Sequence, residues 1–408
     1  MIKSFLILCL LCFLCSFPSS LAQKAPSTVY LLKPAQVFDG ESMHTGWVVL
    51  VRNDKIASAG PATNVTASDA RTIDLPGKTL MPGMIEAHSH VLLHPYNETT
   101  WNDQNAHESL ALRVARATVH LQRTLAAGFT TIRDLGTEGA AYADVGLKQA
   151  VEQGIIPGPR MLVVTRAIVA TGSYGPKGFA AEWTVPQGAE EASGNDVIRV
   201  VRDQIGHGAD WIKIYADYRW GLNNTAAPTF SEEEIRTIVQ TARSTGRAVA
   251  AHASTAEGMR RAANGGVETI EHGDQGTAEV FRLMKEKGVS YIPTLSTGGP
   301  TNERKKGVFK LALESGVTIG SGSDVGVFPH GDEAREIELL GAFGMPLVEA
   351  LKAATSIDAK ILHMEDRIGR VKEGLFADLI AIDGDPSKDL AKLHNVTFVM
   401  KNGVIYKQ

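Results

Sequence analysis

The sequence predicts an α/β fold, a (β/α)8 TIM barrel with a small β-sandwich domain built from both ends of the chain. Between residues 81 and 365, eight short apolar runs alternate with stretches of helical periodicity, a pattern typical of parallel strands joined by helices. Residues 27–80 and 366–408 instead contain short alternating runs separated by Asp-Gly, Asn-Asp and Asn-Gly pairs. Such runs are typical of small antiparallel strands, so we expect the two ends to form one sheet domain.

The first 22 residues have the composition of a secretory signal peptide. Lys3 supplies a positive charge, residues 5–17 are apolar, and small residues precede an expected cleavage after Ala22. The apolar run is shorter than the roughly 18 residues that a spanning helix needs. We therefore expect export to the periplasm or the extracellular medium, with no stable membrane anchor. All three cysteines lie in this segment, so any metal site of the mature chain must use nitrogen and oxygen ligands.

The barrel strands are predicted from eight apolar runs. In chain order these are MPGMIEAHSH, TTIRDLG, RMLVVTRAIVA, WIKIYAD, AVAAHAS, ETIEHG, SYIPTLS and VTIGSGSD. The helix before AVAAHAS is expected to begin at a capping box made by Ser231 and Glu234. In a barrel of this type the chemistry is found at the C-terminal ends of the strands.

The charge balance bears on the kind of partner. The formal net charge is −4, and no basic run occurs. This argues against nucleic acid or an anionic membrane as a partner. We expect a small-molecule or peptide substrate, and the sequence leaves a homo-oligomer open.

Six polar side chains end or interrupt the predicted strands, where a core should be apolar. They are His88, His90, Lys213, His252, His272 and Asp324. The first two are spaced i, i+2, so on a strand they point to the same face. A lone histidine is more often a structural residue. Four imidazoles, a carboxylate and a lysine at strand ends, however, form a ligand set for two divalent metal ions, for which zinc is the first expectation.

Lys213 is the most informative of the six, because a charged lysine in the apolar run WIKIY is costly to bury. An ion pair with a nearby carboxylate would explain it, as would a strand edge that lets the side chain reach solvent. A carbamate, formed from the neutral amine and CO2 and bridging two cations, explains it better beside the other five residues.

These features together resemble the amidohydrolase superfamily. They are LMPGMIEAHSH, the lysine and histidines of strands four to six, Asp324, and the closing GRVKEGLFADLIAIDGDP. The resemblance covers nearly the whole mature chain and is strongest to the imidazolonepropionase-like, metal-dependent members, which include secreted dipeptidases and carboxypeptidases. It implies one buried metal bound by His88, His90 and Asp324, a more exposed metal bound by His252 and His272, and Lys213 bridging both as a carbamate.

The expected function is that of a binuclear metal hydrolase that cleaves an amide C–N bond in a dipeptide or an N-acyl amino acid. Two cations lower the pKa of a bridging water to about 7, and the resulting hydroxide would attack the carbonyl. Asp324 would take the proton and pass it to the leaving amine. Tyr215, two residues past Lys213, is either a donor to the oxyanion or a core tyrosine.

Candidate substrate-binding residues are expected on loops that follow the strand ends. They are His94, Tyr96, Tyr218, Arg219 and His330, with Arg166 and Arg219 as candidates for gripping a substrate carboxylate. Each is individually more often a structural residue. His107 and His120 are expected on the solvent side of the first helical region.

Other functions remain open at this point. A cyclic amide or lactone hydrolase would use the same ligands. A mononuclear deaminase is disfavoured by Lys213, because imidazolonepropionases and related deaminases use one metal and no bridging lysine. A metal-binding protein without activity is disfavoured by the intact ligand set. A dehydrogenase is disfavoured because the GSGSDVG segment has Val325 at the third glycine position of a dinucleotide-binding loop.

Overall fold

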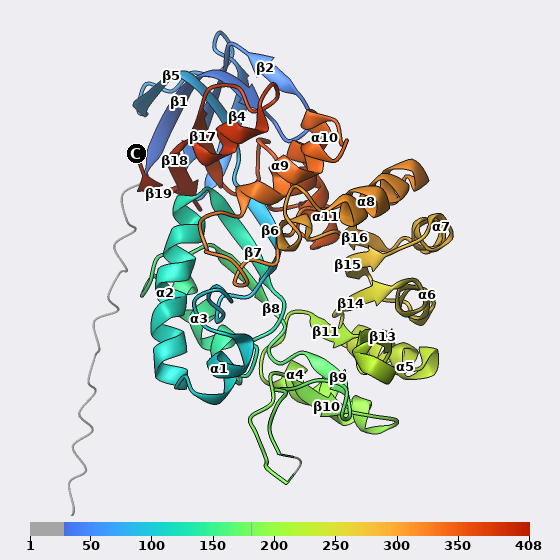
Figure 1. The fold of residues 1–408 in the computed structure, drawn as a ribbon. Helices are drawn as coiled ribbons and strands as arrows, with labels where there is room; N and C mark the ends of the chain where they lie inside the picture. Colours follow the sequence, from blue (N-terminus) through green and yellow to red (C-terminus); the bar gives the residue numbers. More distant parts are fainter. Residues whose placement is uncertain (1–27, 181) are drawn as a thin grey trace, which may run out of the picture.

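A computed structural model describes residues 28–180 and 182–408. The predicted signal peptide lies outside these residues. Figure 1 shows the strands from both ends of the chain gathered at one end of the molecule, with the alternating strands and helices of the central region beside them. Within the described residues, no helix has both the length and the apolar character needed to cross a membrane.

The two ends of the chain form one sheet, as predicted, but it is mixed and not purely antiparallel, because β1 and β5 pair in parallel. Its order is β19-β18-β17-β5-β1-β3-β4, and β2 pairs with β1. The antiparallel pairing of β17 with β5 places Ala381 opposite Leu80 and joins the two ends. Asn402 and Gly403 have φ angles of 49° and 72°, which fit the expected tight turn between β18 and β19. The strands are β1 Val29–Phe38, β2 Met43–Thr45, β3 Trp47–Arg52, β4 Lys55–Pro61, β5 Arg71–Pro82, β17 Leu379–Asp383, β18 Val396–Lys401 and β19 Val404–Lys407.

The barrel consists of parallel strands in two hydrogen-bonded groups. One has the order β6-β7-β8 and the other β10-β9-β11-β14-β15-β16. The third predicted run splits into β8 and β9 around Thr165, whose φ is 65°. The strands are β6 Met84–Ser89, β7 Phe129–Asp134, β8 Arg160–Val163, β9 Ile168–Ala170, β10 Glu190–Ala192, β11 Ile212–Tyr215, β14 Val249–Thr255, β15 Thr269–Gln275 and β16 Ser290–Ile292.

The eighth predicted strand closes the barrel without forming a regular ladder. Tyr291 N donates to Thr318 O at 2.8 Å on one side, and Ala87 N donates to Ser321 O at 3.0 Å on the other. Two glycines in this run permit the close approach. A Cβ at Gly322 would lie 2.8 Å from the Cβ of His88, so the glycine lets this segment lie directly against the first strand.

Helices surround the strands, and in Figure 1 α5 to α8 lie outside β11 to β16. The predicted capping box is present at the start of α5, with Ser231 and Glu234 bonded reciprocally. A short hairpin of β12 (Asp217–Arg219) and β13 (Ala226–Pro228) follows the C-terminal end of β11. The helices are α1 Trp101–Ala106, α2 Leu110–Ala126, α3 Ala143–Glu152, α4 Asp196–Gly206, α5 Glu232–Arg243, α6 Ala256–Gly265, α7 Ala278–Lys287, α8 Glu303–Ser315, α9 Ala334–Ala342, α10 Leu347–Lys352 and α11 Asp358–Ile361.

The expectation that His120 faces solvent was wrong. It lies on the buried stripe of α2, three residues after Ala117 and four before Thr124, and is 8% exposed. Its Nδ1 donates to Val91 O at 2.9 Å. The helical period predicts this position once the apolar residues around it are counted as the inner face. His107, at the end of α1, has an exposed side chain.

Candidate active site

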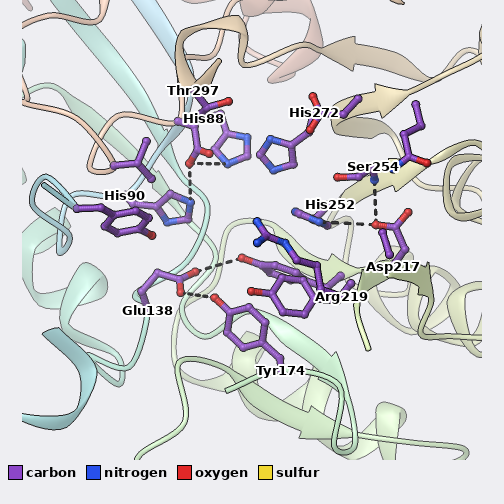
Figure 2. A pocket seen from close by; sticks show the side chains of 18 of the residues that line it. His88, His90, Glu138, Tyr174, Asp217, Arg219, His252, Ser254, His272 and Thr297 are labelled. Carbon is purple, nitrogen blue, oxygen red and sulfur yellow. Dashed lines mark hydrogen bonds and ion pairs between the residues drawn. The ribbon is translucent and has the colours of Figure 1, made fainter. Parts of the chain in front are cut away.

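A cavity of about 650 Å3 opens at the C-terminal ends of the barrel strands. Five of the six predicted metal ligands line it: His88, His90, His252, His272 and Asp324. The sixth, Lys213, lies on β11 behind this surface and is 1% exposed. Figure 2 shows the histidines pointing into the cavity: His88 lies on β6 and His90 directly follows it, while His252 lies on β14 and His272 on β15.

The four imidazoles form a continuous row across the cavity. The centroids of the His90 and His88 rings are 5.4 Å apart, those of His88 and His272 are 5.0 Å apart, and those of His272 and His252 are 4.6 Å apart. The sequence predicted that these residues end their strands and together bind metal ions, but it gave no distances between their rings. The fold brings their rings into contact.

Three ligands at one end of this row converge on a single point. Candidate ligand atoms of His88, His90 and Asp324 all lie within 4.8 Å of one another. Asp324 Oδ1 is 3.5 Å from His88 Nε2 and 3.3 Å from His90 Nε2. The backbone of Asp324 has a φ of 64° and that of His272 a φ of 71°. Left-handed backbone is uncommon at residues other than glycine, and such residues cluster at active sites.

Hydrogen bonds hold three of these rings by the nitrogen that faces away from the cavity. His88 Nδ1 donates to Glu271 Oε2 at 2.8 Å, and His90 Nδ1 donates to Gly136 O at 2.9 Å. His272 Nδ1 lies 2.7 Å from Thr294 Oγ1. Such partners fix the ring and its tautomer, and they leave the Nε2 lone pair for a metal ion. His252 differs, because its Nε2 lies 3.7 Å from Asp217 Oδ1.

Glu271 and Arg133 support this arrangement from behind, and neither was singled out from the sequence. Both are fully buried, and Arg133 Nη2 lies 3.1 Å from Glu271 Oε1. Arg133 Nε also donates to Ala87 O, next to His88, at 2.8 Å. The sequence does contain a sign of both residues, because Arg133 interrupts the apolar run TTIRDLG and Glu271 interrupts the run ETIEHG.

Burial makes three of the imidazoles suitable as neutral ligands. It lowers the pKa of His88 and of His272 well below 6.5, and it lowers the pKa of His252 to about 3, assisted by the nearby Lys213 charge. Burial also lowers the pKa of Lys213 to about 8. His90 is the exception: burial lowers its pKa, but the hydrogen bond to Asp324 and the negative charges of Asp324, Glu138 and Asp134 together raise it to about 9. A metal cation would take the place of that proton between His90 and Asp324.

The predicted substrate-binding residues divide into two groups. Tyr96, Tyr215, Tyr218 and Arg219 line the cavity. His94, Arg166 and His330 do not: His94 Nε2 bonds to Glu108 at 2.9 Å, Arg166 pairs with Glu190, and the ring of His330 stacks on that of His120 at 4.4 Å.

The cavity also contains residues that the sequence did not reveal. They are Glu138, Tyr174, Asp274 and Arg304, among others. Glu138 lies in the loop after β7, where Trp101 Nε1 and Tyr174 OH donate to its Oε2 at 2.8 Å and 2.7 Å. Its side chain does not interrupt an apolar run, so no pattern in the sequence marks it.

Comparison with known proteins settles the family. A model of the amidohydrolase family matches residues 79–406. The chain belongs to the amidohydrolase family. It is therefore a hydrolase that acts on carbon–nitrogen bonds, and the cluster of His88, His90 and Asp324 is a metal-site arrangement typical of amidohydrolases.

Similar proteins fall in several branches of the amidohydrolases. Ochratoxinase of Aspergillus niger is 29% identical over 425 aligned residues, covering 90% of this chain and 84% of ochratoxinase. Imidazolonepropionase of Sphingopyxis alaskensis is 24% identical, covering 84% of this chain and 87% of its own length. Two solved structures are each 29% identical to this amidohydrolase. Each alignment covers 93% of this chain and 100% of the chain in the solved structure. They are a Xaa-Pro dipeptidase with bound methionine (TM-score 0.84) and a prolidase complexed with N-methylphosphonate-L-proline (TM-score 0.82).

Proposed function

We propose that this amidohydrolase is a binuclear metal-dependent hydrolase that cleaves the amide bond of dipeptides or N-acyl amino acids. The row of four contacting imidazoles carries the proposal. It extends from the three-ligand cluster of His88, His90 and Asp324 to His272 and His252. One metal ion needs only the first cluster, so two further neutral imidazoles in ring contact are best explained by a second ion.

Lys213 would link the two ions as a carbamate. With a pKa of about 8, about a tenth of its amine is neutral at pH 7. The neutral nitrogen adds to the carbon of CO2 and releases one proton, which leaves a carbamate anion. This anion supplies oxygen ligands and offsets the positive charge that two buried cations bring to the apolar strand.

Divalent ions, for which zinc is the first candidate, would supply Lewis acidity and lower the pKa of a bound water. The remaining roles belong to the side chains. Asp324 accepts the proton of the attacking water and delivers it to the leaving nitrogen. Tyr215, 7% exposed on the cavity wall, would donate a hydrogen bond from its hydroxyl to the carbonyl oxygen as charge develops there.

Arg219 is the candidate for the substrate carboxylate. It lines the cavity from the β12–β13 hairpin, and no carboxylate oxygen within the described residues lies within ion-pair distance of it. A guanidinium of this kind can receive a carboxylate through two parallel hydrogen bonds. The relatives support an amino-acid-like substrate, because methionine and N-methylphosphonate-L-proline are bound in two of them.

We further propose that residues 1–22 direct export of the protein, to the periplasm or the medium, where the cysteine-free chain of residues 23–408 would act. Detection of the processed N-terminus in a secreted or periplasmic fraction would test this.

The substrate class can be tested with purified residues 23–408 supplied with zinc or manganese. A panel would contain dipeptides, N-acyl amino acids, cyclic amides and lactones, with amino acid release as the readout. We expect turnover of linear substrates that end in a free carboxylate, loss of turnover with a chelator, and recovery on adding metal. Turnover confined to cyclic amides or lactones would contradict the proposal.

A further inference from the structure

Glu138 is a buried carboxylate on the cavity wall that the hydrolytic roles above do not use. It is 3% exposed and lines the cavity, and its backbone has a φ of 47°, which is unusual for glutamate. Figure 2 shows it facing the tyrosines below His90. Three neutral groups donate to it: Trp101, Tyr174 and Tyr215.

No cation of the described chain pairs with this carboxylate. Within the residues that the structure describes, no lysine, arginine or histidine nitrogen lies within 4.0 Å of the Glu138 oxygens. Burial lowers the pKa of Arg113, and the charge of Glu138 offsets part of this from beyond ion-pair distance. The guanidinium of Arg113 donates instead to the carbonyls of Leu92 and Thr137. A carboxylate has about four acceptor positions, so three donors leave room for another. An unpaired buried charge at a cavity wall suits a cationic ligand group.

Glu138 lies close to Tyr215 and His90, so a cation bound by Glu138 must belong to the part of the substrate next to the scissile bond. Its Oε1 lies 3.3 Å from the hydroxyl of Tyr215. A Cβ at Gly136 would lie 3.4 Å from this same oxygen and 3.7 Å from Cε1 of His90. Glu138 therefore lies beside the oxyanion donor, and Gly136 lies between Glu138 and the ring of the metal-ligand candidate His90.

An aminoacyl group fits this spacing. Its carbonyl oxygen and its α-nitrogen are separated by two carbons and lie ~3 Å apart, close to the 3.3 Å between the Tyr215 hydroxyl and Glu138 Oε1. The rings of Tyr174, Tyr215 and Tyr218, with centroids 4.8 to 5.9 Å apart, line the same wall. Aromatic rings next to a carboxylate provide further attraction for an ammonium group.

We propose that Glu138 binds the α-ammonium of the substrate and so makes the enzyme selective for dipeptides with a free amino terminus over N-acyl amino acids. This proposal rests on the proposed function and decides between its two substrate classes. When the scissile carbonyl lies at the Tyr215 hydroxyl, the hydroxyl turns its hydrogen bond from Glu138 Oε1 to the substrate oxygen, and Oε1 becomes free to accept from the ammonium.

A matched pair of substrates tests this directly. Glycyl-L-phenylalanine and N-acetyl-L-phenylalanine differ only in the ammonium group, and pairs with leucine or proline in the second position extend the comparison. With the wild-type enzyme, we expect kcat/KM to be about 10- to 100-fold higher for the glycyl member, as for a hydrogen bond to a charged group. Equal values, or a preference for the acetyl member, would overturn the role of Glu138 without contradicting amide hydrolysis. Turnover of neither class would overturn the proposed function itself.

The variant Glu138→Gln keeps the shape of the side chain and removes its charge. We expect the glycyl-to-acetyl ratio of kcat/KM to fall about 10- to 100-fold. If Glu138 only positions Tyr215 and Tyr174, both substrates lose rate together and the ratio stays unchanged, which would overturn the proposal. Glu108→Gln is the matched control, because Glu108 is a largely buried glutamate paired with Arg116 outside the cavity, and the ratio should not change. The wild-type ratio remains decisive if Glu138→Gln does not fold.

Discussion

At the floor of the cavity, His88 and His90, with Lys213 behind the cavity surface, are at most 4% exposed and are carried by barrel strands or follow one directly. At the mouth, Arg219 and Arg304 are exposed and lie on a short hairpin and a helix outside the barrel. The Nδ1 atom of each floor histidine is hydrogen-bonded, in His88 to Glu271 and in His90 to the Gly136 carbonyl. Among the described residues, the side chains of the two arginines have no hydrogen-bond or ion-pair partner. The side chains at the floor are therefore held in fixed positions, whereas the arginines at the mouth can adjust their positions to a bound substrate.

This difference explains why the two regions should respond differently to substitution. Changes on the floor should remove the chemistry or the metal, because a preorganised ligand set tolerates little movement. Changes at the mouth should alter which substrate is bound and leave the chemical step largely intact. The following four substitutions test this contrast.

The largest effect is expected from Asp324→Asn. The change removes a negatively charged ligand candidate and the proposed proton carrier, so kcat should fall by about 10²- to 10⁴-fold. Steady-state kinetics would measure this, with thermal unfolding as the check that the variant folds. A kcat within tenfold of the wild type would show that Asp324 carries no proton in the reaction.

A smaller effect is expected from Glu271→Gln, which weakens the hydrogen bond that orients His88. Metal affinity should fall by about 10- to 100-fold, as is usual for such supporting partners. Competition with a chelator measures it. The matched control is Glu268→Gln, because Glu268 pairs with the exposed His363 just before the same strand. Equal metal affinity in both variants would contradict the supporting role of Glu271.

At the mouth, Arg219→Ala should raise KM about tenfold for substrates with a free carboxylate, by loss of a charged hydrogen bond, with little change in kcat. Substrates whose carboxylate is amidated should show no such increase. Arg166→Ala serves as the control, since Arg166 pairs with Glu190 outside the cavity. If both arginine variants raise KM equally, the carboxylate is not bound by Arg219.

The smallest effect on activity is expected from His94→Ala. His94 is bonded to Glu108 and Glu98 outside the cavity, so kcat/KM should stay within about threefold of the wild type. The free energy of unfolding should instead fall by about 1–2 kcal/mol because buried hydrogen bonds are lost. Denaturant unfolding and kinetics on the same sample measure both. A tenfold loss of activity with unchanged stability would place His94 in the reaction.

The sequence predicts the floor well, because a polar residue that ends an apolar strand is visible without a structure. His252 and His272 are recognisable in this way, and so is the sheet joined from both ends. The run around Ile319 was also predicted as a strand, but it pairs with its two neighbours through isolated bridges, Ile319 with Tyr291 and Val325 with Ser89.

The mouth could not be predicted in the same detail. Periodicity shows which way a side chain points on a strand or helix, but it says nothing about the direction of a loop. For this reason His94 and His330 were grouped with Tyr96 as rim candidates, although only Tyr96 reaches the cavity. Glu138 is the opposite case, because it lies in a loop among small residues and only the fold shows that it faces Tyr215.

The measurement that tests the account most directly is the metal content of residues 23–408, determined by elemental analysis for the wild type and for Lys213→Ala, together with turnover of a glycyl dipeptide. We expect about two divalent ions per wild-type chain, the ratio that defines a binuclear site. For Lys213→Ala we expect fewer ions and no turnover. One ion per wild-type chain, with activity that does not depend on Lys213, would contradict the binuclear site.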